Sequence, residues 1–246
     1  MSYNWNWGVF LQSTPSGSDT YLGWLFTGLK WTLTLSLSAW LIALVVGGVV
    51  GVLRTAPGKA LGFLAATYVE VFRNIPLLVQ LFIWYFVLPE LVPVKLGDAF
   101  KQMNPVAQQF IAAVLCLGLF TAARVAEQVR AGIQSLARGQ KNAGLALGFT
   151  LPQTYRYVLL PMAVRIIIPP LTSEFLNIFK NSAVATTIGL IELSRQAQQL
   201  VDYTAQPYEA FIAVTVIYLV LNVIIMGLMR KLEKSLRVPG FIVAGK

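Results

Sequence analysis

The sequence predicts an all-α membrane protein with five transmembrane helices, and three observations support this fold class. Of the 246 residues, 57% are hydrophobic and only 12% are charged, with a mean hydropathy of +0.68. A soluble domain carries about 25% charged residues, so lipid is the expected solvent for this chain. Long uncharged runs recur along the sequence, and the basic residues gather between alternate runs, as membrane topology requires.

Three of the five spans are predicted directly from uncharged runs. The span at residues 31–53 is uncharged at all 23 positions, which corresponds to about 35 Å of helix at ~1.5 Å per residue. The spans at residues 105–126 and 209–230 contain uncharged runs of 19 and 20 residues. Each run approaches or exceeds the roughly 20 residues that a helix needs to cross a bilayer.

The second and fourth spans are less regular. The span at residues 72–90 rests on a short uncharged run, so it needs residues from both flanks. The span at residues 164–190 is long enough, but Pro169-Pro170, Glu174 and Lys180 interrupt it. Because proline removes a backbone donor and ionisable groups are costly in lipid, we expect a broken helix with a functional role here.

The basic residues set the predicted orientation. Five spans put the two termini on opposite sides, and an N-terminus outside leaves 14 Lys and Arg residues in the inner segments against four in the outer ones. This asymmetry places residues 1–26 in the periplasm and residues 232–246 in the cytoplasm, as a tail. The transmembrane domain then covers residues 27–231 of a multi-pass protein in the lipid bilayer.

The composition also excludes several classes of function. Histidine is absent, and a single cysteine, Cys116, allows no intramolecular disulfide, so no metal site is expected. The net charge of +9 follows the topology of the loops, so no nucleic-acid partner is expected either. No Gly-x-x-x-x-Gly-Lys-[Ser/Thr] loop occurs, so this chain is not expected to hydrolyse ATP, to act as an enzyme or to bind a cofactor.

A short helix at residues 140–148 is the most informative segment of the loop between the third and fourth spans. Gly139 and Gly148 bracket it, and small residues leave part of its surface nearly bare, so another backbone could approach closely. The small residues are Ala143, Gly144 and Ala146. The alternative interpretation is a plain amphipathic hairpin that lies on the membrane surface.

A second helix is predicted to follow at once. Thr150 and Gln153 have the spacing of a capping box, and Pro152 is tolerated in a first turn. Pro161 is expected to end or kink this helix.

This hairpin resembles the loop with which the membrane subunits of ATP-binding-cassette importers dock onto their ATPase. The signature of that family is Glu-Ala-Ala, three residues, Gly, nine residues, then Ile-x-Leu-Pro. Here it reads Asn142-Ala143-Gly144, three residues, Gly148, nine residues, then Val158-Leu159-Leu160-Pro161, with Gln140 just upstream also fitting. Asn142 replaces the usual Glu, which removes a negative charge beside Lys141 and puts that polar contact with the ATPase in doubt.

Two further segments extend the resemblance to the polar amino-acid uptake branch of this family. The run Tyr68–Gln80 is similar to the entry into the second span of such permeases, and Glu127–Ser135 is similar to the exit from the third. Phe149–Pro161 brings the chain closest to the glutamate/aspartate permease subunits. The resemblance implies a type I importer fold and transport driven by ATP and Mg bound to a partner ATPase.

The same resemblance implies the partners and the cellular location of the chain. They are a dimer of ATP-binding subunits, a second permease subunit (like or unlike) and a periplasmic substrate-binding protein, all at the bacterial inner membrane. Gln140, Asn142, Ala143, Gly144 and Gly148 would make the ATPase contact.

Polar residues at membrane depth are candidates for the transport path. Glu174, Asn177, Lys180 and Asn181 recur at helical spacing and put one polar stripe along the fourth span. The stripe is either a structural seam between subunits or the lining of a solvated path in which Lys180 faces an anionic substrate.

Three other charged residues lie near the spans. Arg73 either faces the path or anchors the second span at the interface. Arg124 and Glu127 lie three residues apart on one helix, so they are predicted to pair, as a structural ion pair or with a transport role.

Two rival classes of function remain open from the residues alone. A secondary transporter or channel for small anionic solutes would explain the spans and the buried charges equally well, but it would usually show internal symmetry, and no convincing repeat is visible. A membrane-embedded enzyme would need a catalytic cluster, for which the membrane carboxylates have no obvious partner. Neither class requires the hairpin.

Overall fold

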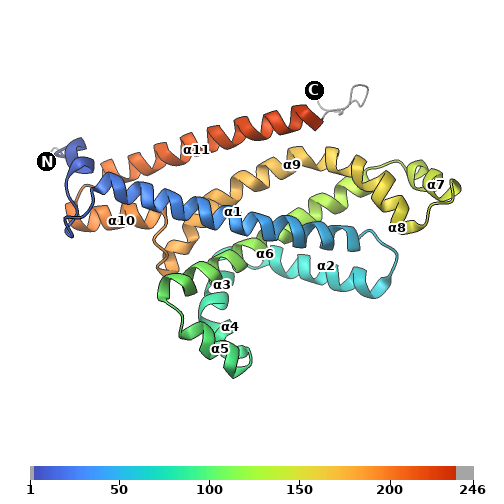
Figure 1. Ribbon diagram of the computed structural model, residues 1–246, viewed down its shortest axis with the longest axis horizontal. Helices are drawn as coiled ribbons and strands as arrows, with labels where there is room; N and C mark the ends of the chain where they lie inside the picture. The colour runs from blue at the N-terminus through green and yellow to red at the C-terminus, as the bar shows by residue number, and fades with distance from the viewer. Residues whose placement is uncertain (1–2, 237–246) are drawn as a thin grey trace.

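The computed structural model describes residues 3–236, and this part of the chain is helical, with no β-strand in it. Four helices are long and apolar enough to cross a membrane, and Figure 1 shows them running along the long axis of the molecule. They are α1 (Tyr21–Leu53), α6 (Pro105–Gln134), the run Leu151–Ile188 that contains α9 (Leu160–Asn181), and α11 (Pro207–Leu236). The predicted all-α fold with several apolar spans is therefore confirmed.

The segment predicted as the second span, residues 72–90, falls in a bent pair of helices. Helix α2 (Lys59–Asn74) and the segment Leu77–Leu91 meet at an angle of 105°. Ile75 is extended, because the ring of Pro76 disfavours helical geometry in the preceding residue. The side-chain amide of Gln80 donates to the carbonyls of Phe72 and Ile75 at 2.8 and 2.9 Å. These bonds satisfy carbonyls at the end of α2 and stabilise the bend.

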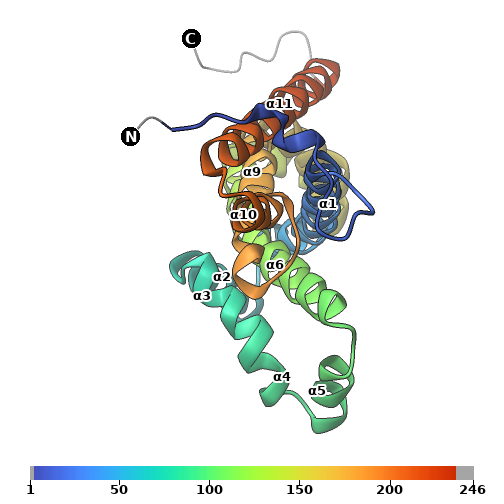
Figure 2. The same ribbon diagram turned by 90° about the vertical axis from the view of Figure 1, so that its left-hand side faces the viewer.

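The bent segment leads into an arm that projects from the bundle. It consists of α3 (Leu77–Phe82), a π-helical turn (Ile83–Val87), α4 (Leu88–Leu91) and α5 (Val94–Lys101). Figure 2 shows α4 and α5 standing away from the four long helices, with α3 nearer to α6.

The fourth span is not broken at its proline pair, as the sequence had suggested. Helix α9 runs without interruption through Pro169 and Pro170, and only at Ser182 does it change into the 3-10 helix Ser182–Ile188. At its start, α8 (Leu151–Thr154) passes through the π-helical turn Tyr155–Leu159 directly into α9, so Pro161 does not end the helix.

Helices α1 and α6 pack side by side through a seam of small residues. A Cβ on Gly51 would lie 2.5 Å from the Cβ of Val129, and a Cβ on Gly47 would lie 2.7 Å from the Cβ of Val125. A Cβ on Gly118 of α6 would lie 2.9 Å from the Cβ of Ile42 of α1. Membrane helices gain stability from van der Waals contact instead of the hydrophobic effect, so these glycines allow the close approach that holds the pair together.

Helix α10 (Leu193–Thr204) closes one end of the bundle, together with the 3-10 helix Trp7–Leu11 and the start of α11. We call this the α10 end, and the opposite end, with α7 (Arg138–Ala146) and α8, the hairpin end. Glu192 is fully buried and caps α10, since its carboxylate accepts from the Arg195 amide at 2.8 Å and the Tyr218 hydroxyl at 3.2 Å. Burial raises the pKa of Glu192, although these hydrogen bonds oppose the shift.

Candidate functional site

The hairpin predicted around residues 140–148 forms as an α7–α8 pair. Helix α7 spans Arg138–Ala146. Gly148 follows two residues later and has a φ of +83°. The amide of Gly148 donates to the carbonyl of Leu145 at 3.0 Å, and the amide of Phe149 donates to that of Gly144 at 3.1 Å. This is a Schellman C-cap, in which glycine adopts the left-handed conformation at little cost.

The second helix of the hairpin starts with the capping box that the sequence predicts. The Thr150 side chain accepts from the Gln153 amide, and the Gln153 side chain accepts from the Thr150 amide at 2.8 Å. The two caps fix the turn between α7 and α8, so local sequence chemistry accounts for the shape of the hairpin.

One face of α7 is open and the other packs on α8. Asn142 and Ala143 are exposed, and Leu147 is 77% exposed. Gly144 is buried and packs closely on α8, since a Cβ added there would lie 2.8 Å from the Thr154 methyl group. Gly144 therefore serves the packing of the hairpin itself, which corrects the interpretation that it leaves the outer surface of α7 bare.

Gln140 is the other polar member of the predicted set on α7. It is half-buried, and its side-chain oxygen makes no hydrogen bond within residues 3–236. The atom itself is buried, and a buried acceptor without a donor carries a desolvation cost.

The predicted ion pair between Arg124 and Glu127 is wrong. Glu127 instead binds Arg54, at the end of α1, and Arg130, one turn further along α6, with Arg73 at 3.9 Å. Glu127 has an arginine three residues before it and another three residues after it, so helical spacing alone could not choose between them. The role of Arg54 was missed, because its only sequence signal is its position at the end of a span.

Arg124 reaches across to the fourth span. Its Nε donates to Glu174 at 2.8 Å, which joins α6 to α9, and its guanidinium lies 5.9 Å from the Phe120 ring centroid. The Glu174 side chain is buried, whereas that of Arg124 is 43% exposed. The pair thus presents a partly uncovered cation at membrane depth, where contact with lipid would be costly.

The other members of the predicted stripe lie further along the same helix. Asn177 and Asn181 are half-buried, and Lys180 is exposed. Glu174, Asn177 and Asn181 follow helical spacing of three and four, whereas Lys180 lies beside this line. Within the described chain, the stripe therefore runs from a buried carboxylate to uncovered polar groups.

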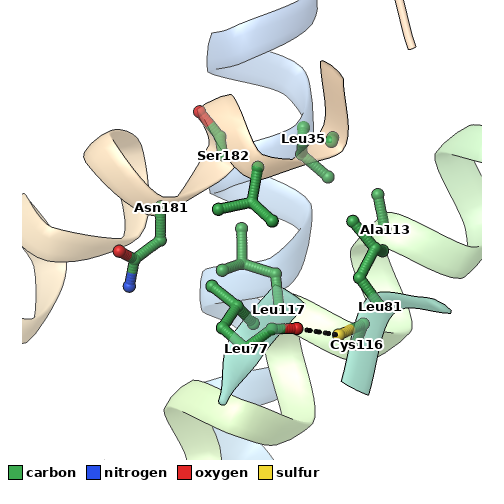
Figure 3. A pocket seen from close by; sticks show the side chains of 10 residues that line it. Leu35, Leu77, Leu81, Ala113, Cys116, Leu117, Asn181 and Ser182 are labelled. Carbon is green, nitrogen blue, oxygen red and sulfur yellow. Dashed lines mark hydrogen bonds between the residues drawn. The ribbon is translucent and has the colours of Figure 1, made fainter. Parts of the chain in front are cut away.

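A small cavity lies beside Asn181 and Ser182, between α1, α3, α6 and the 3-10 helix. Figure 3 shows Leu35, Leu77 and Leu117 converging on it, with Cys116 directed at the Leu77 carbonyl. Its volume is about 10 Å³, which is at most the space of one water molecule. This cavity cannot hold an amino acid.

Apolar spans, a bent pair and an exposed, capped hairpin between the third and fourth spans define a multi-pass membrane protein of the transport type. The chain belongs to the family of binding-protein-dependent transport system inner membrane components, whose model matches residues 43–238. This confirms the family resemblance deduced from the hairpin and its flanking motifs.

Several proteins are similar to this chain over most of their length. It is 56% identical to the glutamate/aspartate import permease protein GltJ of Escherichia coli (strain K12), over 98% of both chains. It is 37% identical to the probable glutamine ABC transporter permease protein GlnM of Bacillus subtilis (strain 168), over 85% of this chain and 91% of that one. Both are permease proteins, as the resemblance of Tyr68–Gln80 and Glu127–Ser135 to such permeases predicts.

Solved structures share the fold. A crystal structure of an amino acid ABC transporter with histidines matches with a TM-score of 0.75 and 33% identity, over 87% of this chain and 95% of that one. An inward-facing structure of the MetNI methionine ABC transporter matches with a TM-score of 0.72 and 22% identity, over 92% and 100% of the two chains. The fold is therefore that of an ABC importer permease.

Proposed function

We propose that this chain is the membrane-spanning permease subunit of an ATP-driven importer of glutamate and aspartate in the bacterial inner membrane. The observation that carries the substrate is the 56% identity to a glutamate/aspartate import permease over 98% of both chains. Family membership supports the importer class over a secondary transporter or channel, because the family is defined by dependence on a binding protein. The chain itself catalyses no reaction in this proposal.

The proposed orientation puts the α10 end outside and the hairpin end in the cytoplasm. The inner segments then carry 14 of the Lys and Arg residues, and the outer segments carry four. The described ends of the chain, near Tyr3 and Leu236, lie at opposite ends of the bundle, as an odd number of spans requires (Figure 1). A periplasmic binding protein would then approach the α10 end.

The open face of α7 is the proposed contact for the partner ATPase. Asn142 and Ala143 are exposed there, and the half-buried Gln140 lies two residues before them on the same helix. Gly148 contributes through the left-handed turn that ends α7, and Gly144 through its packing on Thr154. ATP and Mg bind to the ATPase dimer, which supplies the energy for transport.

A continuous helix links this contact to the polar stripe. The run Leu151–Ile188 begins in the hairpin and carries Glu174 and Lys180. When ATP draws the two ATPase subunits together, α7 moves with them, and this helix passes the movement to the stripe because α9 is unbroken through Pro169-Pro170. The membrane helices then rock between inward-facing and outward-facing states.

The polar stripe and its neighbours on α6 form one wall of the proposed path. Arg124, Lys180, Asn177 and Asn181 are all partly or fully uncovered within the chain. A second permease subunit that packs against this face would keep them from lipid and complete the path. Cationic groups in such a path suit a dicarboxylic amino acid. Arg73, with a side chain that is 44% exposed and 3.9 Å from Glu127, would lie at the cytoplasmic mouth.

The experiment that tests this proposal is uptake by the assembled importer in proteoliposomes with its binding protein. Radiolabelled glutamate, aspartate, glutamine and arginine are offered separately, with ATP inside the vesicles. We expect uptake of glutamate and aspartate that requires ATP. Uptake of glutamine or arginine alone would overturn the substrate, and uptake that requires an ion gradient instead of ATP would overturn the importer class.

A further inference from the structure

A groove of about 290 Å³ lies where the end of α1 meets the start of the Leu151–Ile188 helix. Its walls are apolar or aromatic, and they come from both elements. They are Val52 and Ala56 on one side, and Leu151, Pro152, Tyr155 and Leu160 on the other. The Tyr155 hydroxyl donates to the carbonyl of Thr55 at 2.7 Å, so the two walls are tied together.

The groove lies at the membrane boundary. The first predicted span ends at residue 53, between Val52 and Ala56, and Leu160 lies four residues before the fourth predicted span begins at residue 164, so the groove stands at the predicted level of the headgroups. The volume is close to the lower limit, about 300 Å³, of sites that take small molecules. An apolar groove at this level is open to the acyl chains of the surrounding leaflet.

The charge around the groove is positive. Arg156 is the charged residue of its lining, and among residues 3–236 it forms no ion pair, lying instead 5.7 Å from the Tyr157 ring centroid. The rim therefore favours an anionic group beside an apolar one.

We propose that this groove binds an anionic phospholipid, with an acyl chain between α1 and α8 and the phosphate at Arg156. The ligand is a lipid of the cytoplasmic leaflet in the proposed orientation, and phosphatidylglycerol is its simplest bacterial form. The groove joins α1 to α8, which is the second helix of the hairpin. A bound lipid would therefore brace the hairpin against the first span. A basic pocket beside membrane helices is a common lipid headgroup site.

The test uses the assembled importer, reconstituted into vesicles of phosphatidylcholine mixed in equal parts with phosphatidylglycerol and then extracted in mild detergent. Native mass spectrometry counts the lipids that each complex retains. We expect the wild type to retain phosphatidylglycerol in preference to phosphatidylcholine. Arg156→Gln should weaken that preference about fivefold, the change that one basic residue at an anionic surface supplies.

Three further variants separate the groove from general charge. Ala56→Phe fills the groove and leaves Arg156 in place, so it should also release phosphatidylglycerol. Arg156→Lys keeps the charge and should retain most of the lipid. Arg165→Gln removes another exposed arginine of the fourth span, outside the groove, and should change nothing.

Two results would overturn the lipid site. One is equal retention of both lipids by the wild type and by Arg156→Gln. The other is an Ala56→Phe complex that loses its ATPase subunits but retains phosphatidylglycerol, because that result would mean that the groove contacts the ATPase and not a lipid. The lipid count does not depend on the transported amino acid, so retained phosphatidylglycerol without glutamate uptake would remove only the proposed substrate.

Discussion

The α1–α6 seam and the α7–α8 hairpin both depend on glycine, but they use it in opposite ways. In the seam, Gly47 and Gly51 face Val125 and Val129 so closely that no side chain fits. In the hairpin, a Cβ added to Gly139 or Gly148 would meet no atom within 4 Å, and only Gly144 is packed, against Thr154 of the same hairpin. The seam is packed within one chain, whereas the hairpin leaves a surface that is exposed among the described residues.

This difference separates two kinds of sensitivity. A change in the seam should damage the fold whether or not partners are present. A change on the open face of α7 should leave the fold intact and damage only assembly, because Asn142 and Ala143 are exposed within residues 3–236. Four pairs of substitutions test this separation.

The largest expected effect is that of Gly51→Leu in the seam. A Cβ would stand 2.5 Å from the Val129 Cβ, so α1 and α6 must separate along the whole contact. Overpacking of this kind costs about 1–3 kcal/mol or more. We expect little monodisperse protein in detergent and a lower thermal midpoint. Gly48→Leu is the matched control, since Gly48 has open space around it, and equal behaviour of the two variants would contradict the seam.

The second substitution is Ala143→Arg on the open face of α7. We expect a thermal midpoint like that of the wild type, because Ala143 is exposed, together with at least a tenfold loss of ATPase in co-purification, which corresponds to about 1.4 kcal/mol. Ala99→Arg, at an exposed position of α5, is the control and should keep the ATPase. Undiminished recovery of the ATPase with Ala143→Arg would remove the proposed contact.

The third substitution, Glu127→Gln, tests whether the end of the seam is also self-contained. It leaves Arg54, Arg73 and Arg130 without their shared carboxylate. We expect a loss of about 1–2 kcal/mol in stability, below that of a fully buried pair because the Glu127 side chain is 24% exposed. The lower thermal midpoint should be absent in Glu70→Gln, whose carboxylate is exposed. An unchanged midpoint in both variants would mean that the cluster contributes nothing.

The smallest effects are expected for substitutions of two glycines in α7, which are compared with each other. Gly144→Ala puts a methyl group 2.8 Å from Thr154, so the hairpin must open slightly, and amide exchange across residues 138–154 should become faster. Gly139→Ala meets no atom and gains helix propensity, up to about 1 kcal/mol, so exchange should slow or stay the same. If both variants behave alike, the packing role of Gly144 is wrong.

Local chemistry made most of the fold and the hairpin predictable. The uncharged runs marked the first, third and fifth spans, because the length of an apolar run is a direct requirement of the bilayer. Thr150, Gln153 and Gly148 marked the helix caps, because each of them makes its cap hydrogen bond with a residue only a few positions away in the sequence. These features depend on neighbours in the sequence.

The features that the sequence did not reveal depend on distant parts of the chain. Hydropathy measures the length of an apolar run and not its direction, so the 105° bend at Pro76 was hidden, while the pair at Pro169-Pro170 was expected to break a helix that remains whole. Arg124 could have paired with Glu127 one turn away, but Glu174 of another helix holds it. Only the packing of α6 on α9 decides between them.

The π-helical turn at Tyr155–Leu159 takes one extra residue into the helix that joins the hairpin to α9. The Leu160 amide donates to the Tyr155 carbonyl, five residues back, and Pro161 follows where an α-helical turn would lack a donor. Such a turn holds one residue more than an α-helical turn, so it absorbs the extra residue and leaves the helix on either side at nearly the same azimuth. Each residue of an α-helix advances the chain by about 100°, so deleting one residue from α9 beyond the turn would swing α7 about 100° around the helix axis. The direction in which the proposed docking surface faces therefore depends on residue count in α9, whereas the π-helical turn can lose its extra residue with little rotation.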